Sequence, residues 1–269
     1  MKRILAWVVP VWLAASAAAF AQPDEELFGF GLTSWYPRVR GDMRSDTVAG
    51  QGTTLDLPNT LDVAKAEDGM GVVDAWIHLP SLPITLSFSA YGGRFEERSF
   101  LASAVTFAGA MFGPGPALTT GHAVARGYTL AAEWLPPILN NLVENLELRL
   151  IAGIHYVAHD IRMIEGAVES RRSVNALVPH LGVRATWIVY NQVEIEAAIR
   201  GFPEVTFGDH SYQHVDMTAE FRWIASDNFK VGGGYRMINL MGLDESHKPN
   251  VDHLDIQMSG FFVSAYLVF

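Results

Sequence analysis

The chain has 269 residues, a formal net charge of −10 and no cysteine. An acidic chain repels the phosphates of nucleic acid, so nucleic acid is not expected as a partner, and the missing cysteines exclude a disulfide framework. Beyond the N-terminal segment, no run of about 18 apolar residues is present that would cross a membrane as a helix.

The N-terminus has the pattern of a secretory signal. Met1-Lys2-Arg3 is basic, an apolar run extends from Ile4 to Ala19, and Ala19-Phe20-Ala21 supplies small residues before an acidic stretch. This order predicts a signal peptide over residues 1–21, with residues 22–269 forming one mature domain. The alternative is an uncleaved N-terminal membrane helix.

The mature chain alternates polar and apolar residues in ten segments. In Gln213 to Ala225, the polar residues from His214 to Arg222 alternate with the apolar residues from Val215 to Trp223. A period of two is typical of a β-strand with one polar and one apolar face. In chain order, the predicted strands are about Glu26 to Asp42, Val73 to Leu79, Ile84 to Tyr91, Gly121 to Trp134, Leu146 to Tyr156, His180 to Trp187, Val193 to Gly201, Gln213 to Ala225, Phe229 to Gly242 and Leu254 to Phe269.

The connectors between these strands alternate between short and long. Tight turns are predicted at Pro80 to Pro83, Tyr190 to Gln192 and Ser226 to Asn228, because Pro, Asn and Asp suit turns. The medium-length connector from Pro136 to Asn145 has room for a helical turn. Long links are predicted near residues 43–70, 99–120, 162–175, 203–212 and 243–253.

These patterns favour an all-β, transmembrane, up-and-down antiparallel β-barrel over a soluble periplasmic β protein. In a membrane barrel the apolar face meets lipid, the polar face lines the lumen, and short turns lie on the periplasmic side. Strands of about 9 to 11 residues suffice to cross the bilayer. We therefore predict about ten strands, with eight or twelve as alternatives, in a cell outer membrane.

The last strand resembles that of Gram-negative outer-membrane β-barrel proteins. Phe261, Val263, Ala265, Leu267 and Phe269 place apolar residues at alternate positions and end on Phe. The resemblance implies that these five residues form a membrane-insertion signal for the barrel-assembly machinery, and that lipid and lipopolysaccharide are partners. The family often has Tyr two residues before the end, where this chain has Leu267.

A second resemblance concerns a group of small, uncharacterised barrels similar to the W-type outer-membrane proteins. It rests on Gly233-Gly234-Tyr235-Arg236, on Leu82 to Leu86, and on Asp255, Gly260 and Phe269. This group implies no chemistry.

The polar faces of the predicted strands define a set of lumen-lining residues of both charge signs. An eight- to ten-stranded barrel has an interior little wider than its side chains, so a charge-paired, plugged, structural lumen and a narrow channel for small solutes both remain open. Mixed charge predicts little ion selectivity. The set comprises Asp74, His78, Glu133, Glu147, Arg149, His155, His180, Arg184, Glu194, Glu196, Arg200, Asp216, Glu220, Arg222, Lys230 and Arg236.

The alternative function is that of an outer-membrane hydrolase acting on lipid A or peptides at the extracellular rim. Acid and His neighbours occur at His159-Asp160, Asp209-His210-Ser211, Asp244 to His247 and Asp252-His253, and a His oriented by a carboxylate can activate water or Ser. However, adjacent residues on a strand point to opposite faces. We therefore predict no catalytic residue and, without fixed ligand spacing, no metal ligand or cofactor.

Overall fold

The computed structural model describes residues 27–46, 52–60, 69–80, 82–115, 118–137, 145–189, 192–207, 209–247 and 250–269. The predicted signal peptide and most of the connector from Pro136 to Asn145 lie outside the described residues. No helix within the described part of the chain is long and apolar enough to cross a membrane.

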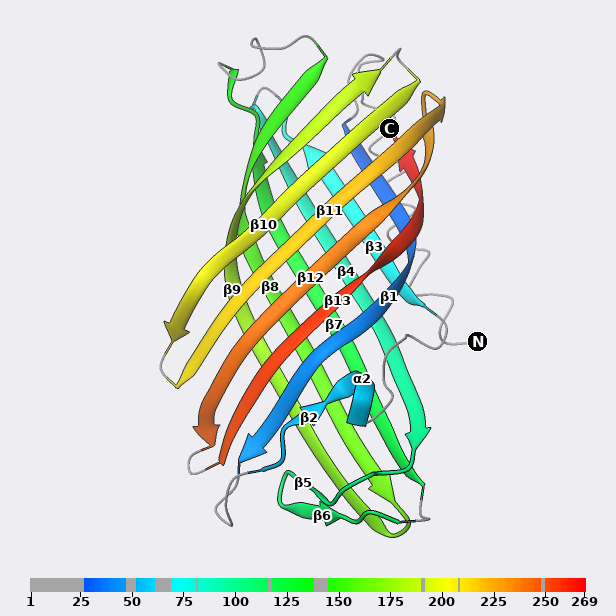
Figure 1. Ribbon diagram of the computed structural model, residues 1–269. Coiled ribbons are helices and arrows are strands. Elements are labelled where there is room, and N and C mark those ends of the chain that lie inside the picture. The colour runs from blue at the N-terminus through cyan, green and yellow to red at the C-terminus, as the bar shows by residue number, and fades with distance from the viewer. Residues whose placement is uncertain are drawn as a thin grey trace, which may run out of the picture.

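Ten long antiparallel strands form one closed sheet (Figure 1). Each strand pairs with the next of the ten along the chain, and the last pairs with the first, so the predicted fold and strand number are confirmed. Each of the ten predicted segments corresponds to one strand. They are β1 (Phe28–Asp46), β3 (Met70–His78), β4 (Ile84–Ser99), β7 (Thr119–Trp134), β8 (Leu146–Glu165), β9 (Val168–Val189), β10 (Val193–Phe207), β11 (His210–Ser226), β12 (Phe229–His247) and β13 (Asn250–Val268).

Four short elements complete the fold. The two-residue strand β2 (Leu55–Asp56) pairs with β1 and continues into the short helix α2 (Leu57–Thr60). The strands β5 (Val105–Phe107) and β6 (Ala110–Phe112) form a separate hairpin between β4 and β7. These elements lie in the two longest connectors, at the end of the barrel opposite the chain's C-terminus (Figure 1).

Three of the predicted long links are wrong, because the strands continue through them. β8 and β9 are separated only by residues 166–167, β10 and β11 by residues 208–209, and β12 and β13 by residues 248–249. These six strands are therefore longer than a bilayer requires. The parts that extend beyond the bilayer carry polar side chains on the outer face, in water, so their sequence resembles that of loops.

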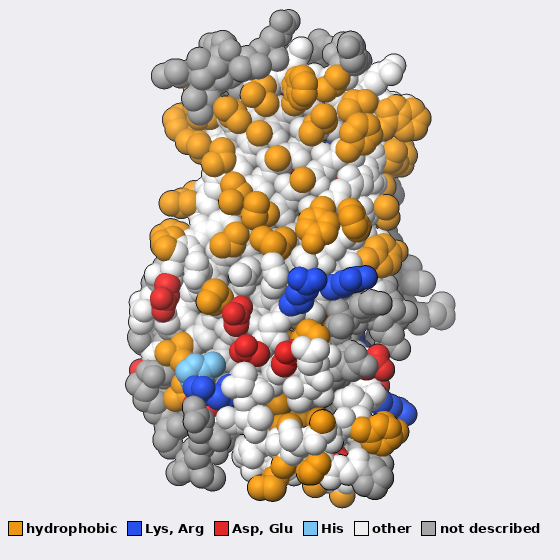
Figure 2. Space-filling view, in the orientation of Figure 1, with side chains coloured by type: hydrophobic (Ala, Val, Ile, Leu, Met, Phe, Trp, Pro, Cys, Tyr) orange, Lys and Arg blue, Asp and Glu red, His pale blue; other side chains and the backbone are white. Residues whose placement is uncertain are grey.

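The outer surface divides the barrel into two halves. Around the half near the short turns, apolar side chains form a broad belt, and charged side chains lie beyond it (Figure 2). In β7, for example, Trp134, Leu130 and Tyr128 are exposed on the belt, and Arg126 follows. We call the belted half the membrane half and the other the outer half, because short turns lie on the periplasmic side of such barrels.

The interior of the outer half is a packed apolar core. Phe107 and Phe112 of the β5–β6 hairpin and Leu55 and Leu57 from the β2–α2 connector are at most 1% exposed. Thr53 N donates to Thr106 O at 2.9 Å and joins the two connectors. They pack against wall residues that include Val39, Phe95, Ile161, Met163, Val174, Ile238, Leu254 and Ile256. Within the described residues, the connectors and the wall thus share one buried apolar cluster.

The Phe107→Ala substitution should lower the free energy of unfolding by about 3 to 5 kcal/mol, because it removes a fully buried ring and leaves a cavity. The matched control is Met111→Ala on the same hairpin. Met111 is 70% exposed, so this change should stay within about 0.5 kcal/mol. Urea unfolding of the protein refolded into lipid vesicles measures both. Equal effects would show that the hairpin is not part of the core.

Candidate functional site

The membrane half encloses a polar cavity of about 680 Å³. Its lining includes Pro80, Pro83 and Leu135 beside the short-turn end, and Trp35 and Arg236 deeper in the barrel. The apolar core of the outer half lies beyond. We call this space the lumen cavity, and it is the candidate functional site.

Six carboxylates and six cationic side chains line the lumen cavity, so its fixed charges balance. Thirteen of the sixteen residues predicted to line the lumen do line it: Asp74, His78, Glu133, Glu147, Arg149, Arg184, Glu194, Glu196, Arg200, Glu220, Arg222, Lys230 and Arg236. The other three, His155, His180 and Asp216, are at most 2% exposed and lie outside the cavity lining.

Arg222 is the centre of the largest ion-pair group. Its Nη1 lies 2.8 Å from Glu196 Oε2, and its Nη2 lies 2.6 Å from Glu220 Oε2. Glu220 also accepts a hydrogen bond from the Tyr266 hydroxyl at 2.9 Å, and the Arg222 guanidinium carbon lies 4.6 Å from the centre of the Tyr266 ring. These side chains come from β10, β11 and β13, so the group joins three strands of one side of the wall.

Asp216 is the centre of a second group deeper in the barrel. It is 1% exposed and lies between two guanidinium groups, with Arg200 Nη2 at 3.0 Å and Arg236 Nη2 at 2.8 Å. The guanidinium carbon of Arg236 lies 5.5 Å from the ring centres of both Trp35 and Tyr91. A buried carboxylate is thus paired with two cations, as burial of charge requires.

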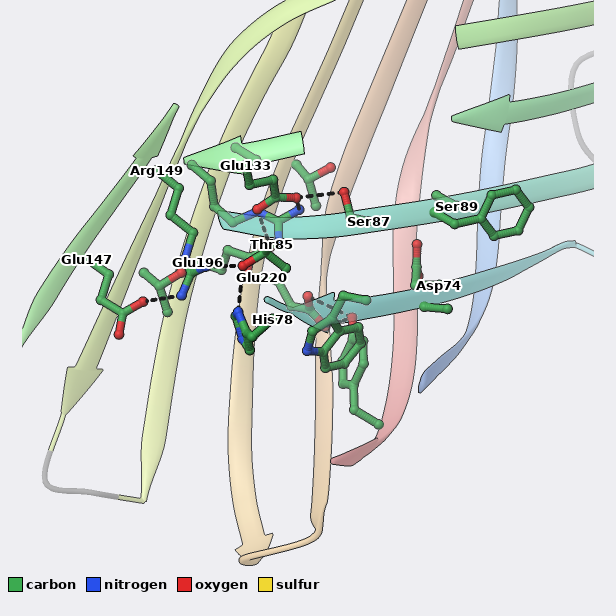
Figure 3. A pocket seen from close by; sticks show the side chains of 18 of the residues that line it. Asp74, His78, Thr85, Ser87, Ser89, Glu133, Glu147, Arg149, Glu196 and Glu220 are labelled. Carbon is green, nitrogen blue, oxygen red and sulfur yellow. Dashed lines mark hydrogen bonds and ion pairs between the residues drawn. The ribbon is translucent and has the colours of Figure 1, made fainter. Parts of the chain in front are cut away.

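A third group lies nearer the short turns (Figure 3). Arg149 Nη2 lies 2.9 Å from Glu147 Oε2, and Arg149 Nη1 donates to Thr85 Oγ1 at 2.5 Å. Thr85 Oγ1 also lies 2.6 Å from His78 Nδ1. Two positions along β4 from Thr85, Ser87 Oγ donates to Glu133 Oε1 of β7 at 2.9 Å. Arg184 Nη2 lies 3.2 Å from the same oxygen.

The predicted lumen residue His155 contacts His214, which the sequence places only on a polar strand face. The ring centres of the two histidines are 4.4 Å apart. His155 Nδ1 lies 3.0 Å from Thr129 Oγ1, and its Nε2 lies 3.3 Å from the Tyr91 hydroxyl. Both histidines are 1% exposed and lie outside the lining of the lumen cavity.

Glycine makes room for the large side chains of the lumen. A Cβ atom at Gly31 would lie 2.6 Å from the Tyr266 ring, and one at Gly232 would lie 2.7 Å from Glu220 Oε1. Both positions face the lumen, where Tyr266 and Glu220 join the Arg222 group. A strand glycine commonly marks such a close approach.

The residues of the predicted insertion signal lie on the last strand and at the chain end. Phe261, Val263 and Leu267 are exposed on the outer face, at 73%, 59% and 46%, and Ala265 is partly exposed. The ring of Phe269 stacks on that of Phe28 at 4.9 Å. The chain end is thus attached to the beginning of β1, and recognition of these residues by assembly machinery stays a prediction.

Several residues of the cavity lining are absent from the predicted set, because that set contains only charged residues and histidine. Thr85 and Ser87 of β4 and Tyr266 of β13 line the cavity, and they lie on the faces of these strands that alternate with the apolar outer faces. Their register alone could have identified them. The packing of Trp35 and Tyr91 near Arg236 could not have been identified, because it joins strands far apart in the sequence.

The described acid and His neighbours point to opposite sides of the wall. His159 is buried inside the barrel, whereas Asp160 forms an exposed hydrogen-bonded ion pair with Arg171. Asp252 is 3% exposed and pairs with Arg172 at 2.7 Å. Its neighbour His253 instead lies 2.7 Å from Arg44 Nη2 and 3.5 Å from Asp46 Oδ2. The side chains of His210 and His247 lie outside the described residues.

No family model and no curated protein matches the chain. Among solved structures, it is similar to the outer membrane protease OmpT from Escherichia coli, with a TM-score of 0.57 and 9% identity over 93% of this chain and 99% of that chain. It is also similar to the translocator domain of the autotransporter NalP from Neisseria meningitidis, with a TM-score of 0.41 and 12% identity over 98% and 96% of the two chains. The closed ten-stranded sheet and the first of these similarities show that the chain has the fold of the Gram-negative outer-membrane β-barrels, and its apolar belt places it in that membrane, in contact with lipid.

The Arg222→Met substitution should lower the free energy of unfolding by about 3 to 5 kcal/mol, because it removes the cation closest to the buried carboxylates of Glu196 and Glu220. Arg162→Met is the matched control, since Arg162 pairs with Glu169 on the exposed surface. That change should cost at most about 1 kcal/mol. Urea unfolding in vesicles compares the two, and equal losses would contradict the charge-paired lumen.

His159 should make stability depend on pH. It lies three residues beyond Tyr156 of the belt, inside the outer half, between Ala125 and Val174 of the neighbouring strands. Burial lowers the pKa of His159 from 6.5 to about 4. Between these values the unfolded chain binds more protons, so the free energy of unfolding should fall as pH falls from 6.5 to 4, by about 3 kcal/mol in all.

The measurement compares urea unfolding of the parent and His159→Leu at several pH values. The other histidines are common to both proteins, so the difference between their pH curves isolates His159. Identical curves would show that the pKa of His159 is not lowered by folding.

Proposed function

We propose that this protein is a non-enzymatic, non-conducting outer-membrane barrel with a structural or envelope-interaction role. Its charge-paired lumen forms a cavity toward the periplasm and is closed toward the outside. The observation that carries the proposal is the apolar core of the outer half, in which Phe107 and Phe112 have no exposed surface.

The apolar core argues against a permanent path for water or solutes. Interiors of this kind are packed to the density of organic crystals and leave few voids larger than a water molecule. The core here combines two connectors with wall residues from β1, β8, β9, β12 and β13. Opening it would expose a large apolar surface to water, which is unfavourable.

The charges of the lumen cavity support the same conclusion. A channel that selects ions presents unpaired charges or carbonyl oxygens to the permeating ion. Here the cationic side chains of Arg222, Arg184 and Lys230 are held by Glu194, Glu196 and other carboxylates at distances of 2.6 to 3.8 Å. The balanced pairs stabilise the narrow barrel and leave little net field for an ion.

The hydrolase alternative has less support. Hydrolysis by a general base would need a His oriented toward water or a nucleophile in an accessible site. His159 is buried in an apolar environment, and Asp160 lies on the other face of its strand. The similarity to a protease in solved structures, at 9% identity, concerns the fold.

The proposal predicts that the lumen cavity is reached from the periplasm and not from outside. The chain has no cysteine, so Ser87→Cys in the cavity lining and Met111→Cys on the outer hairpin each introduce one thiol. A membrane-impermeant maleimide added to intact cells should label only the Met111→Cys variant. After the outer membrane is permeabilised, it should label both.

Labelling of the Ser87→Cys variant from outside intact cells would contradict the proposal and support a channel. Planar-bilayer recording gives an independent check, because the refolded parent protein should produce no conductance steps. Turnover of lipid A or peptides by the purified parent would instead support the hydrolase alternative.

A further inference from the structure

Arginines follow the apolar belt on one side of the barrel. On β1, Arg38 is the next outward residue after the exposed Tyr36, and on β7, Arg126 is the next outward residue beyond the exposed Tyr128. On β4, Gly92 pairs with Arg126, and Arg94 lies two positions farther from the belt. All three arginines are exposed, and each is the first charged outward residue on its strand beyond the belt.

On the other side of the barrel, the first polar residue beyond the belt is not an arginine on any of four strands. The first polar outward residue beyond the belt is Asp160 on β8, Asn175 on β9, Gln213 on β11 and Asn239 on β12. Basic side chains are therefore concentrated over β1, β4 and β7, which lie side by side apart from the short strand β3. We call Arg38, Arg40, Arg94 and Arg126 the arginine patch. Figure 2 shows basic side chains directly beyond the belt.

Among the described residues, the arginine patch has no carboxylate partner. Within the described residues, none of its four guanidinium groups forms an ion pair. By contrast, the exposed Arg162 and Arg171 are paired with Glu169 and Asp160. Carboxylates of the chain thus pair with the exposed arginines on β8 and β9. No described carboxylate pairs with the arginine patch, so its guanidinium groups are available to an external anion.

A groove of about 540 Å³ adjoins the patch on β1. Arg38 and Arg40 line it, together with Pro58 and Asn59 from the α2 segment. Gly41, with a φ of 116°, follows Arg40 directly. The backbone therefore leaves the regular strand conformation where the groove is formed. The groove also contains carboxylates, at Asp42 and Asp56, farther from the belt than Arg38.

We infer that the arginine patch binds the phosphate groups of lipopolysaccharide, the outer-leaflet glycolipid, while its acyl chains lie along the belt. Arginine forms bidentate, charge-assisted hydrogen bonds with phosphate. A ligand that contacts both the apolar belt and the arginines must be an anionic amphiphile. A soluble anion would gain nothing from the belt, because it has no apolar surface to place there.

The test uses the full mature chain in phosphatidylcholine nanodiscs that contain either bisphosphorylated lipid A or the same lipid without its phosphates. Native mass spectrometry after release from the disc counts the retained glycolipid. The parent should retain the phosphorylated form and release the other. Replacing all four arginines of the patch by Gln should weaken retention on the order of a hundredfold or more, since each basic residue at a membrane surface contributes about fivefold.

Arg98→Gln is the matched control, because Arg98 is exposed on the same strand as Arg94 but lies four residues farther from the belt. It should leave retention unchanged, whereas Arg38→Gln and Arg94→Gln should each lower it about fivefold. These single variants decide the question if the fourfold variant does not fold. Equal retention of the dephosphorylated lipid, an equal loss in Arg98→Gln, or displacement by equimolar inorganic phosphate would each overturn the inference. None of these results depends on whether the lumen conducts.

Discussion

The pairing of β1 with β13 is the constraint on which the rest of the structure depends. It extends from Gly29 opposite Val268 to Asp46 opposite Val251 and removes both free edges of the sheet. Without it, two rows of unpaired backbone groups would face a solvent that cannot satisfy them. Closure with ten strands also fixes a lumen little wider than its side chains. Charges that face inward must therefore pair with one another, as Arg222 does with Glu196 and Glu220.

The same strands pass through two media, and the polarity of their faces reverses between them. On β8, Leu150 and Ile154 face lipid while Arg149 and His155 face inward. Farther along the strand, Asp160 and Arg162 face water, and inward residues such as Ile161 and Met163 are fully buried and apolar. The membrane half consequently holds a polar cavity, and the outer half is built like a soluble domain around an apolar core.

This reversal also connects the cavity with the arginine patch. The boundary between the two halves lies where outward residues change from apolar to polar, and there the chain places Arg38, Arg94 and Arg126. Inside the barrel, cations are matched by carboxylates of the same chain. Outside, next to the belt, no described carboxylate pairs with them, and the proposed partners are phosphates of the surrounding lipid. The fold itself does not specify these features, since function in a shared fold resides in the sites placed on it.

The strand segments, the barrel fold and the face to which each charged residue belongs could be predicted from the sequence. Alternation with a period of two is a local property, and residues such as Asp74, Glu133 and Lys230 carry it in their immediate neighbours. The length of the strands beyond the membrane could not be predicted, because polar outward residues near 162–175 resemble a loop until the inner face is known to be packed. Which charges pair and where the apolar core lies also depend on the tertiary structure. Those contacts, such as Arg222 with Glu196 or Phe107 with the barrel wall, depend on the register between segments far apart in the chain, which no local pattern contains.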